Sequence, residues 1–281
     1  MNLKKIKHFT LLIRPKHWVK NIFVLLPLFF SNSFHDVNLI YQAAMAFVIF
    51  SLTASSVYIV NDLVDKNKDS NHPKKKFRPI ASGKILMHEA VLFLSLLLIS
   101  IIYFGYQRLD LLLVTVIYFL INLAYSFVLK KYAVVDIFTI ALGFVLRVYC
   151  GVIAINVDIS NWILITTFCL ALFLASIKRK QELIKNYNQT RASLNVYNTE
   201  LINFYINISG ISAIIFYSLF SITIKDQFFI TIPIVIFAFF RYLYLTEIVK
   251  KGESPTDALF EDKLFIIILL SWAILCFYLL S

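Results

Sequence analysis

Residues 61–83 combine acidic and basic side chains in a pattern that could bind a metal ion and phosphates. Asp62, Asp65 and Asp69 are spaced i, i+3 and i+7, which would place all three on one face of a helix. Three carboxylates so close repel one another unless a cation binds between them. Mg²⁺ commonly takes one or two carboxylates together with substrate phosphates. The spacing therefore indicates a site for Mg²⁺, or for Mn²⁺ in its place, although a solvated acidic loop explains it equally well.

A basic stretch follows the aspartates, and its parts have different interpretations. Lys74, Lys75 and Lys76 form a polybasic run, which beside a membrane usually serves topology and attraction to anionic lipids. Arg78 precedes a proline, and a rigid turn there could direct a bidentate guanidinium group at a phosphate. Arg78 is therefore a candidate phosphate ligand, and Asn61 adds a polar group at the membrane end of the cluster.

The composition assigns these residues to a polytopic membrane protein. The chain of 281 residues is 60% hydrophobic and only 15% charged, and a soluble domain of this length has no interior large enough for that content. The formal net charge of +11 is explained by basic cytoplasmic loops, so we expect no nucleic-acid partner. Cys150, Cys169 and Cys276 lie apart within apolar runs, which predicts ordinary buried thiols.

Nine apolar stretches are candidates to cross a bilayer, which takes roughly 20 residues each; they are 20–34, 39–61, 88–106, 109–129, 133–155, 160–181, 200–223, 226–248 and 260–280. If the N-terminus is cytoplasmic, nearly all Lys and Arg residues outside the spans lie on the inside, with Arg108 and Lys225 on the other side. The even-numbered spans then end at the cytoplasmic face. We therefore expect an all-α bundle of nine helices and one domain over residues 1–281, with the charged residues gathered at one face.

The aspartate cluster is similar to a known motif. The UbiA superfamily of intramembrane transferases carries a first aspartate-rich motif that resembles Asn61-Asp62-x-x-Asp65-x-x-x-Asp69 followed by Arg78-Pro79-Ile80-x-Ser82-Gly83. Members of that superfamily are nine-helix bundles in which this motif holds Mg²⁺ at the diphosphate leaving group. The resemblance implies that Asp62, Asp65 and Asp69 are metal ligands. Because Asp69 lies farther from the membrane end, we expect Asp62 and Asp65 to be the more sensitive positions in catalysis.

The segment after the sixth span separates two branches of the superfamily. Aromatic prenyltransferases carry a second aspartate-rich motif there, whereas this chain reads Lys178-Arg179-Lys180-Gln181-Glu182. One carboxylate cannot assemble a second multi-carboxylate metal site, and a cationic cluster suits a phosphate held directly. Further stretches resemble the decaprenyl-phosphate phosphoribosyltransferase branch: residues 14–21, Tyr125 to Lys130, Asp136 with Gly143 and Arg147, Arg191, residues 252–256, Leu259 and Asp262.

That branch transfers phosphoribose from phosphoribosyl diphosphate to a polyprenyl phosphate and releases diphosphate, so the resemblance implies these two partners. The phosphates of these two substrates would be held by cations near the cytoplasmic face, which are Lys20, Arg78, Lys130, Lys178 and Arg179. Asn61, Tyr125 and Glu182 are further candidate substrate contacts, although Tyr125 could equally be an interfacial aromatic residue. The resemblance also implies a bacterial plasma (inner) membrane and a site facing the cytoplasm, whereas the oligomeric state is left open.

Arg147 lies inside a predicted span, where an ionisable residue is costly and usually faces a cavity or a partner. We expect substrate contact there, and the alternative is a structural arginine paired with an acid or with carbonyl oxygens.

Two other functions remain. A UbiA-type prenyltransferase would move a polyprenyl group from its diphosphate to an aromatic or other small acceptor. A lipid or solute transporter is disfavoured, because transporters place ionisable groups near the midplane.

Overall fold

The computed structural model describes residues 3–71, 73, 75–158, 160–184, 192–249 and 261–281. Every regular element within these ranges is a helix, which confirms the all-α prediction. Helices suit the long apolar runs because they pair each backbone N–H and C=O group within one segment, where lipid offers no partner.

Eight helices in the described ranges are long and apolar enough to cross a membrane. They are α3 (Val37–Val64), α5 (Met87–Gly105), α6 (Leu109–Phe127), α7 (Val135–Ile155), α8 (Asn161–Ile184), α9 (Thr199–Ile224), η6 (Asp226–Thr231) continued by α10 (Ile232–Glu247), and α12 (Lys263–Leu280). The protein is therefore an integral membrane protein. The predicted spans agree with these helices except at the N-terminus.

The predicted first span, 20–34, is not one helix. Its residues are divided between a 3₁₀ helix, η1 (Pro15–Leu25), and a short α-helix, α2 (Leu26–Phe30), with Pro27 in the first turn of α2. Proline suits a helix start because it has no N–H to lose there. The predicted count of nine spans is thus not reached in the described ranges, and the cytoplasmic position of the N-terminus stays a prediction.

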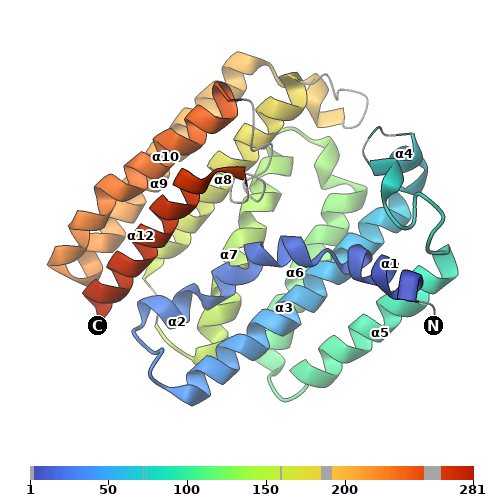
Figure 1. Ribbon diagram of the computed structural model, residues 1–281, viewed down its shortest axis with the longest axis horizontal. Coiled ribbons are helices and arrows are strands. Elements are labelled where there is room, and N and C mark those ends of the chain that lie inside the picture. Colours follow the sequence, from blue (N-terminus) through green and yellow to red (C-terminus); the bar gives the residue numbers. More distant parts are fainter. Residues whose placement is uncertain (1–2, 72, 74, 159, 185–191, 250–260) are drawn as a thin grey trace.

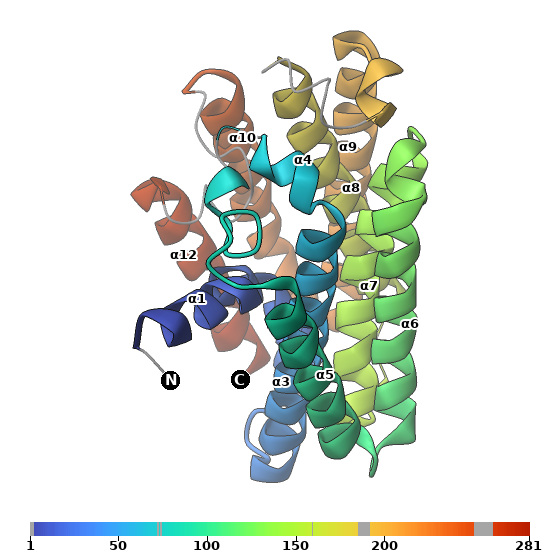
Figure 2. The same ribbon diagram turned by 90° about the vertical axis from the view of Figure 1, so that its right-hand side faces the viewer.

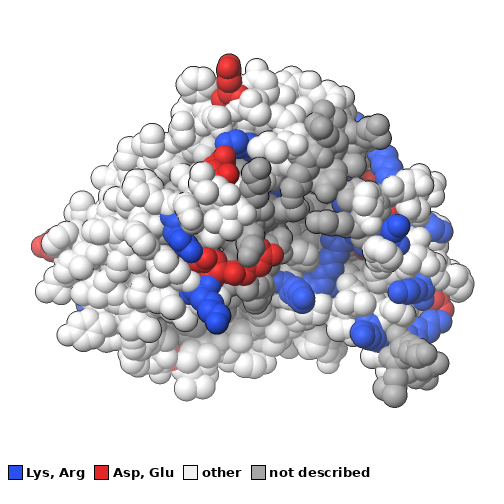
Figure 3. All heavy atoms as spheres, turned by 45° about the horizontal axis from the view of Figure 1, so that its top comes forward, with Lys and Arg blue, Asp and Glu red and all other residues white. Residues whose placement is uncertain are grey.

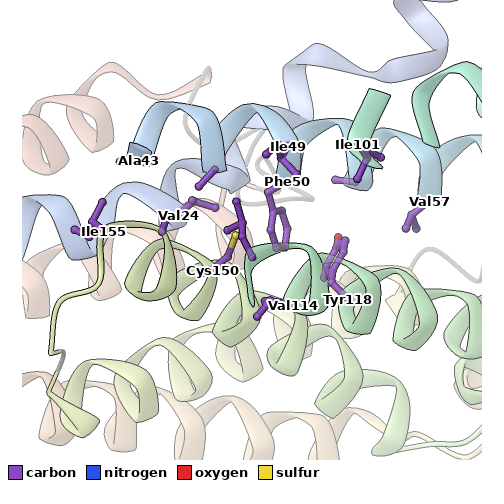
Figure 4. Close-up of a cluster of buried hydrophobic side chains, with 14 residues drawn as sticks. Val24, Ala43, Ile49, Phe50, Val57, Ile101, Val114, Tyr118, Cys150 and Ile155 are labelled. Atoms are coloured by element: carbon purple, nitrogen blue, oxygen red, sulfur yellow. The ribbon is translucent and has the colours of Figure 1, made fainter. Parts of the chain in front are cut away.

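The N-terminal segment packs tightly into the bundle. A Cβ atom on Gly151 of α7 would lie 1.9 Å from the carbonyl oxygen of Val24, so only glycine permits this approach of η1. Around this contact, Val24, Phe50, Tyr118 and Cys150 belong to one buried apolar cluster shared by η1, α3, α6 and α7 (Figure 4). All three cysteines are buried and free, as predicted.

Helix α1 (Leu3–Ile13) lies across the spanning helices rather than along them (Figures 1 and 2). Figure 2 also shows that α3, α6, α8 and α10 all finish at one end of the bundle, which we call the aspartate end. The short elements α4 (Lys66–Ser70), η2 (Lys75–Phe77), η3 (Leu129–Lys131) and η5 (Ala192–Asn195) lie in the segments that follow α3, α6 and α8. In Figure 3, which brings this end forward, acidic and basic side chains gather there.

Candidate active site

Asp62, in the last turn of α3, is the centre of the charged cluster. Its side chain is 2% exposed, and its Oδ1 accepts hydrogen bonds from Arg14 Nη2 at 2.5 Å and Arg78 Nη1 at 3.0 Å. Its Oδ2 is buried and has no hydrogen-bond partner in the described part of the chain. A buried carboxylate oxygen without a partner is costly, so this atom fits a position for a bound cation.

Asp69 is joined to Asp62 through Arg78. Its carboxylate is also buried, and its Oδ2 accepts from the same Arg78 Nη1 at 2.5 Å. Arg78 is held by a compact loop, in which its own carbonyl oxygen accepts from the Ser82 N–H and Gly83 adopts a φ of 71°. The structure therefore brings Arg78 to the aspartates, although as an ion-pair partner of the carboxylates.

Asp65 lies at the junction of two helices rather than inside one. Helix α3 ends at Val64 and α4 begins after Asp65, which has φ −91° and ψ 9°. The carboxylate of Asp65 pairs instead with Lys130 Nζ of η3, at 2.9 and 3.0 Å. Consequently no three His, Cys, Asp or Glu side chains in the described ranges are grouped as a metal site. The three aspartates therefore do not lie within one uninterrupted helix, as their spacing had suggested, because α3 ends just before the middle aspartate.

The C-terminal end of α6 connects two parts of the site. Ser126 donates a hydrogen bond to Asn61, Lys130 pairs with Asp65, and the Tyr125 hydroxyl accepts from Arg179 Nη2 at 3.2 Å. The bundle thus brings Asn61, Tyr125 and Lys130 together, as the topology predicted. The role of Ser126 was missed, because serine in an apolar helix gives no distinctive signal.

Arg179 and Lys178 lie in different surroundings, although the sequence suggested one cationic cluster. Consecutive residues on a helix are about 100° apart, and here Lys178 is exposed while Arg179 is 1% exposed. Arg179 donates from Nε to Asp136 at 2.7 Å and from Nη1 to Glu182 at 2.5 Å. Its guanidinium group therefore forms ion pairs within the protein.

Asp136 extends this buried network to the segment after α8. It is fully buried and accepts from the Tyr197 hydroxyl at 2.8 Å and from Ser193 at 3.2 Å. Burial raises the pKa of the Tyr197 phenol, so the hydroxyl keeps its proton and remains a donor. The Tyr197 oxygen also accepts from the Val134 N–H at 2.6 Å, and Val134 has a φ of 65°. This network fixes the start of α7 against α8.

Arg147 lies away from the aspartate end, in the middle of α7. It donates to the Asn21 side chain at 2.9 Å, to the Gly143 carbonyl oxygen at 2.7 Å and to the Tyr118 hydroxyl at 2.9 Å. Its guanidinium also packs over the ring of Phe50 at 5.1 Å. These contacts match the structural alternative, and substrate contact by Arg147 stays a prediction.

The N-terminal segment supplies one residue that sequence reasoning did not select. Arg14 joins α1 to η1 with φ 54° and ψ 62°, and its guanidinium group lies 4.9 Å from the Tyr58 ring centroid while it binds Asp62. The sequence signal that could have identified Arg14 was a positively charged residue directly before a proline. Lys20 lies half-buried in η1.

Other predicted residues have simple placements. Asp262, one of the residues of the predicted motifs, pairs with Arg241 of α10 at 2.7 Å. Several residues of the predicted motifs lie outside the described ranges, namely Lys74, Arg191, residues 252–256 and Leu259.

The amino-acid sequence is similar to those of known proteins. A family model described as "UbiA prenyltransferase family" matches residues 22–266. The decaprenyl-phosphate phosphoribosyltransferase of Mycolicibacterium smegmatis is 30% identical, covering 92% of this chain and 88% of that protein. The protein of the same name from Mycobacterium tuberculosis is 32% identical, covering 92% of this chain and 90% of its own length.

Among solved structures, a UbiA homologue from Archaeoglobus fulgidus, described as bound to DMAPP and Mg²⁺, has a TM-score of 0.72 at 18% identity, covering 96% of this chain and 98% of that one. A structure titled for digeranylgeranylglyceryl phosphate synthase has a TM-score of 0.67 at 21% identity, covering 98% of both chains. These similarities show that the fold of the bundle is shared.

Proposed function

The chain belongs to the UbiA prenyltransferase family, and we propose that it transfers 5-phosphoribose from phosphoribosyl diphosphate to a polyprenyl phosphate, releasing diphosphate. Family membership makes it an intramembrane transferase, in agreement with the resemblance recognised from its motifs. The finer reaction is supported by one observation above others. Proteins named decaprenyl-phosphate phosphoribosyltransferase are 30% and 32% identical to it over 92% of the chain.

The residues at the end of α8 also support the proposal that the acceptor carries a phosphate. The acidic side chains that surround Arg179 there, Asp136 and Glu182, are both bound to its guanidinium group. Neither is thus available as it stands for a second metal site, while Lys178 is exposed beside them. A cation at this position suits the phosphate of a polyprenyl phosphate.

The proposed cofactor is Mg²⁺, with Mn²⁺ as an alternative. Asp62, with its buried open oxygen, and Asp69 would hold the ion, joined by Asp65 once its pairing with Lys130 is released. When bound, the metal neutralises charge on the leaving diphosphate. The structural relative from Archaeoglobus fulgidus, described as bound to DMAPP and Mg²⁺, is consistent with this assignment.

The remaining side chains would bind and orient the two substrates. Arg78, Lys130 and Lys20 would contact donor phosphates, and Asn61 with Tyr125 would contact the ribose hydroxyl groups. An ionised acceptor phosphate is itself a nucleophile, so its oxygen forms the new bond to C1 as the bond from C1 to the diphosphate oxygen breaks. No general base is required, and catalysis rests on positioning and charge stabilisation. For Arg179 and Glu182 we propose a positioning role, because each already binds the other.

We further propose that residues 1–281 form one domain in a bacterial plasma membrane, with this site facing the cytoplasm. The bacterial origin of the named relatives and the basic loops of the sequence support this placement.

The test is a transfer assay with purified protein, Mg²⁺, polyprenyl phosphate and labelled phosphoribosyl diphosphate. Label appearing in the lipid fraction is the expected result, and Asp62→Asn is the matched inactive control. A second candidate, prenyl transfer to a small acceptor, is favoured by the structural relative described as bound to DMAPP. A parallel reaction with geranylgeranyl diphosphate and an aromatic acceptor examines it, and product only in that reaction would overturn the proposal.

A further inference from the structure

We infer that the cations already paired with the aspartates make the metal ion and the donor diphosphate bind much more tightly together than either binds alone. The inference rests on the proposed function, since it concerns the metal and donor of the same site. Beyond the assignment of ligands, it states that neither the metal ion nor the diphosphate binds tightly until the other is present.

Among the described residues, the ion-paired cluster around the three aspartates is electrically balanced before any ligand enters. Its formal charges cancel among six side chains: Arg14, Arg78 and Lys130 against Asp62, Asp65 and Asp69. The two most buried aspartates depend on arginine, because Arg78 donates to both and Arg14 donates to Asp62 alone. Breaking one of these buried pairs without a replacement leaves an uncompensated charge.

A balanced site resists a lone ion of either sign. A divalent cation at the open Oδ2 of Asp62 would lie close to the two arginines that hold Oδ1, and would be repelled by both. A diphosphate alone would lie beside the carboxylates of Asp62 and Asp69 and would be repelled by them. When both enter, the arginines can turn from carboxylate to phosphate oxygens while the metal takes the carboxylates. The added charges then largely cancel.

Among the three cations paired with the aspartates, Arg14 is the one with a positive φ. It adopts a left-handed backbone conformation, which is unusual for a residue with a side chain, and it precedes Pro15, which disfavours helical conformations. Such conformations persist only when surrounding contacts hold them. The ion pair with Asp62 and the packing over Tyr58 are those contacts.

The experiment compares thermal unfolding midpoints of the purified full-length protein with Mg²⁺ alone, inorganic diphosphate alone, and both. For the wild type we expect a small shift from each ligand and a shift with both that clearly exceeds the sum. In Arg14→Gln, the Mg²⁺ concentration that gives half the maximal shift should fall roughly tenfold, because one repelling charge is gone. The excess over additivity should shrink accordingly.

Two variants separate charge from folding. Lys5→Gln removes another ion pair of the N-terminal segment, Lys5 with Glu89, and should keep the wild-type excess. Lys130→Gln removes a cation from Asp65 and should act in the direction of Arg14→Gln, which keeps the test decisive if Arg14→Gln does not fold. A wild type that Mg²⁺ alone stabilises fully, or charge variants with an unchanged excess, would overturn the inference. No response of the wild type to Mg²⁺ under either condition would instead reject the proposed metal site.

Discussion

At the scale of single residues, Asp62 differs from its neighbours by having one oxygen bound by two arginines and the other without a hydrogen-bond partner in the described ranges. The change Asp62→Asn keeps the shape and removes the charge that both arginines and a metal require. We expect turnover to fall by roughly 100-fold or more, the loss typical of a removed charge-stabilising group. Steady-state kinetics on folded protein measure this, and near-normal turnover would contradict the assignment.

The same measurement ranks the other two aspartates. The position of Asp69, farther from the membrane end, predicts that Asp65→Asn is more damaging than Asp69→Asn. The structure, in which Asp69 is buried on Arg78 and Asp65 pairs with Lys130, leaves that ranking a prediction.

Lys178 and Arg179 should respond differently to loss of charge. Lys178→Gln should raise the KM for polyprenyl phosphate with little change in unfolding temperature, because the side chain is exposed. Arg179→Gln leaves Asp136 and Glu182 without their buried partner and should cost about 3–5 kcal/mol of stability. Denaturant unfolding and separate substrate titrations distinguish the two effects. Equal changes of KM and of stability in both variants would argue against separate roles for the two residues.

At the scale of elements, η1 is held by a contact that tolerates no side chain on α7. A Cβ atom at Gly151 would lie 1.9 Å from the Val24 carbonyl oxygen, whereas one at Gly143 on the same helix would have its nearest neighbour at 3.5 Å. Gly151→Ala should therefore displace η1, lower the unfolding temperature and reduce activity. Gly143→Ala is the matched control, and its greater helix propensity should leave stability unchanged or slightly raised. Similar unfolding temperatures for the two variants would show that η1 is not tightly packed.

The elements also show what the sequence could predict. Apolar length located the spans closely, as in 109–129 against Leu109–Phe127, because a helix must be long enough to cross the lipid. It failed at 20–34, since proline and 3₁₀ geometry leave hydropathy unchanged. The pairing of Arg179 with Asp136 was unpredictable for another reason. Asp136 lies 43 residues away, and only packing of α7 against α8 decides that they meet.

At the scale of the whole molecule, the two candidate donors make different demands on the bundle. Phosphoribosyl diphosphate would need a metal site, further cations and polar groups, and we propose that the aspartate end supplies them. We expect it to raise the unfolding temperature in the presence of Mg²⁺, as any ligand selective for the folded state does. Geranylgeranyl diphosphate should do so less at equal concentration. The reverse ranking in a thermal shift assay, together with prenyl transfer, would overturn the donor assignment and leave the fold intact.

The length of α3 bears on where the proposed reaction would take place relative to the membrane. Its 28 residues extend about 42 Å, while the hydrocarbon layer of a bilayer is about 30 Å thick. With the helix centred in that layer, the hydrocarbon boundary falls close to residue 60, and Asp62 stands among the lipid head groups. The proposed acceptor, a polyprenyl phosphate diffusing within the bilayer, would carry its phosphate at that depth, and the proposed sugar diphosphate would arrive there from water. The long helix would thus let the two proposed substrates, which differ in solubility, meet without either leaving its own phase.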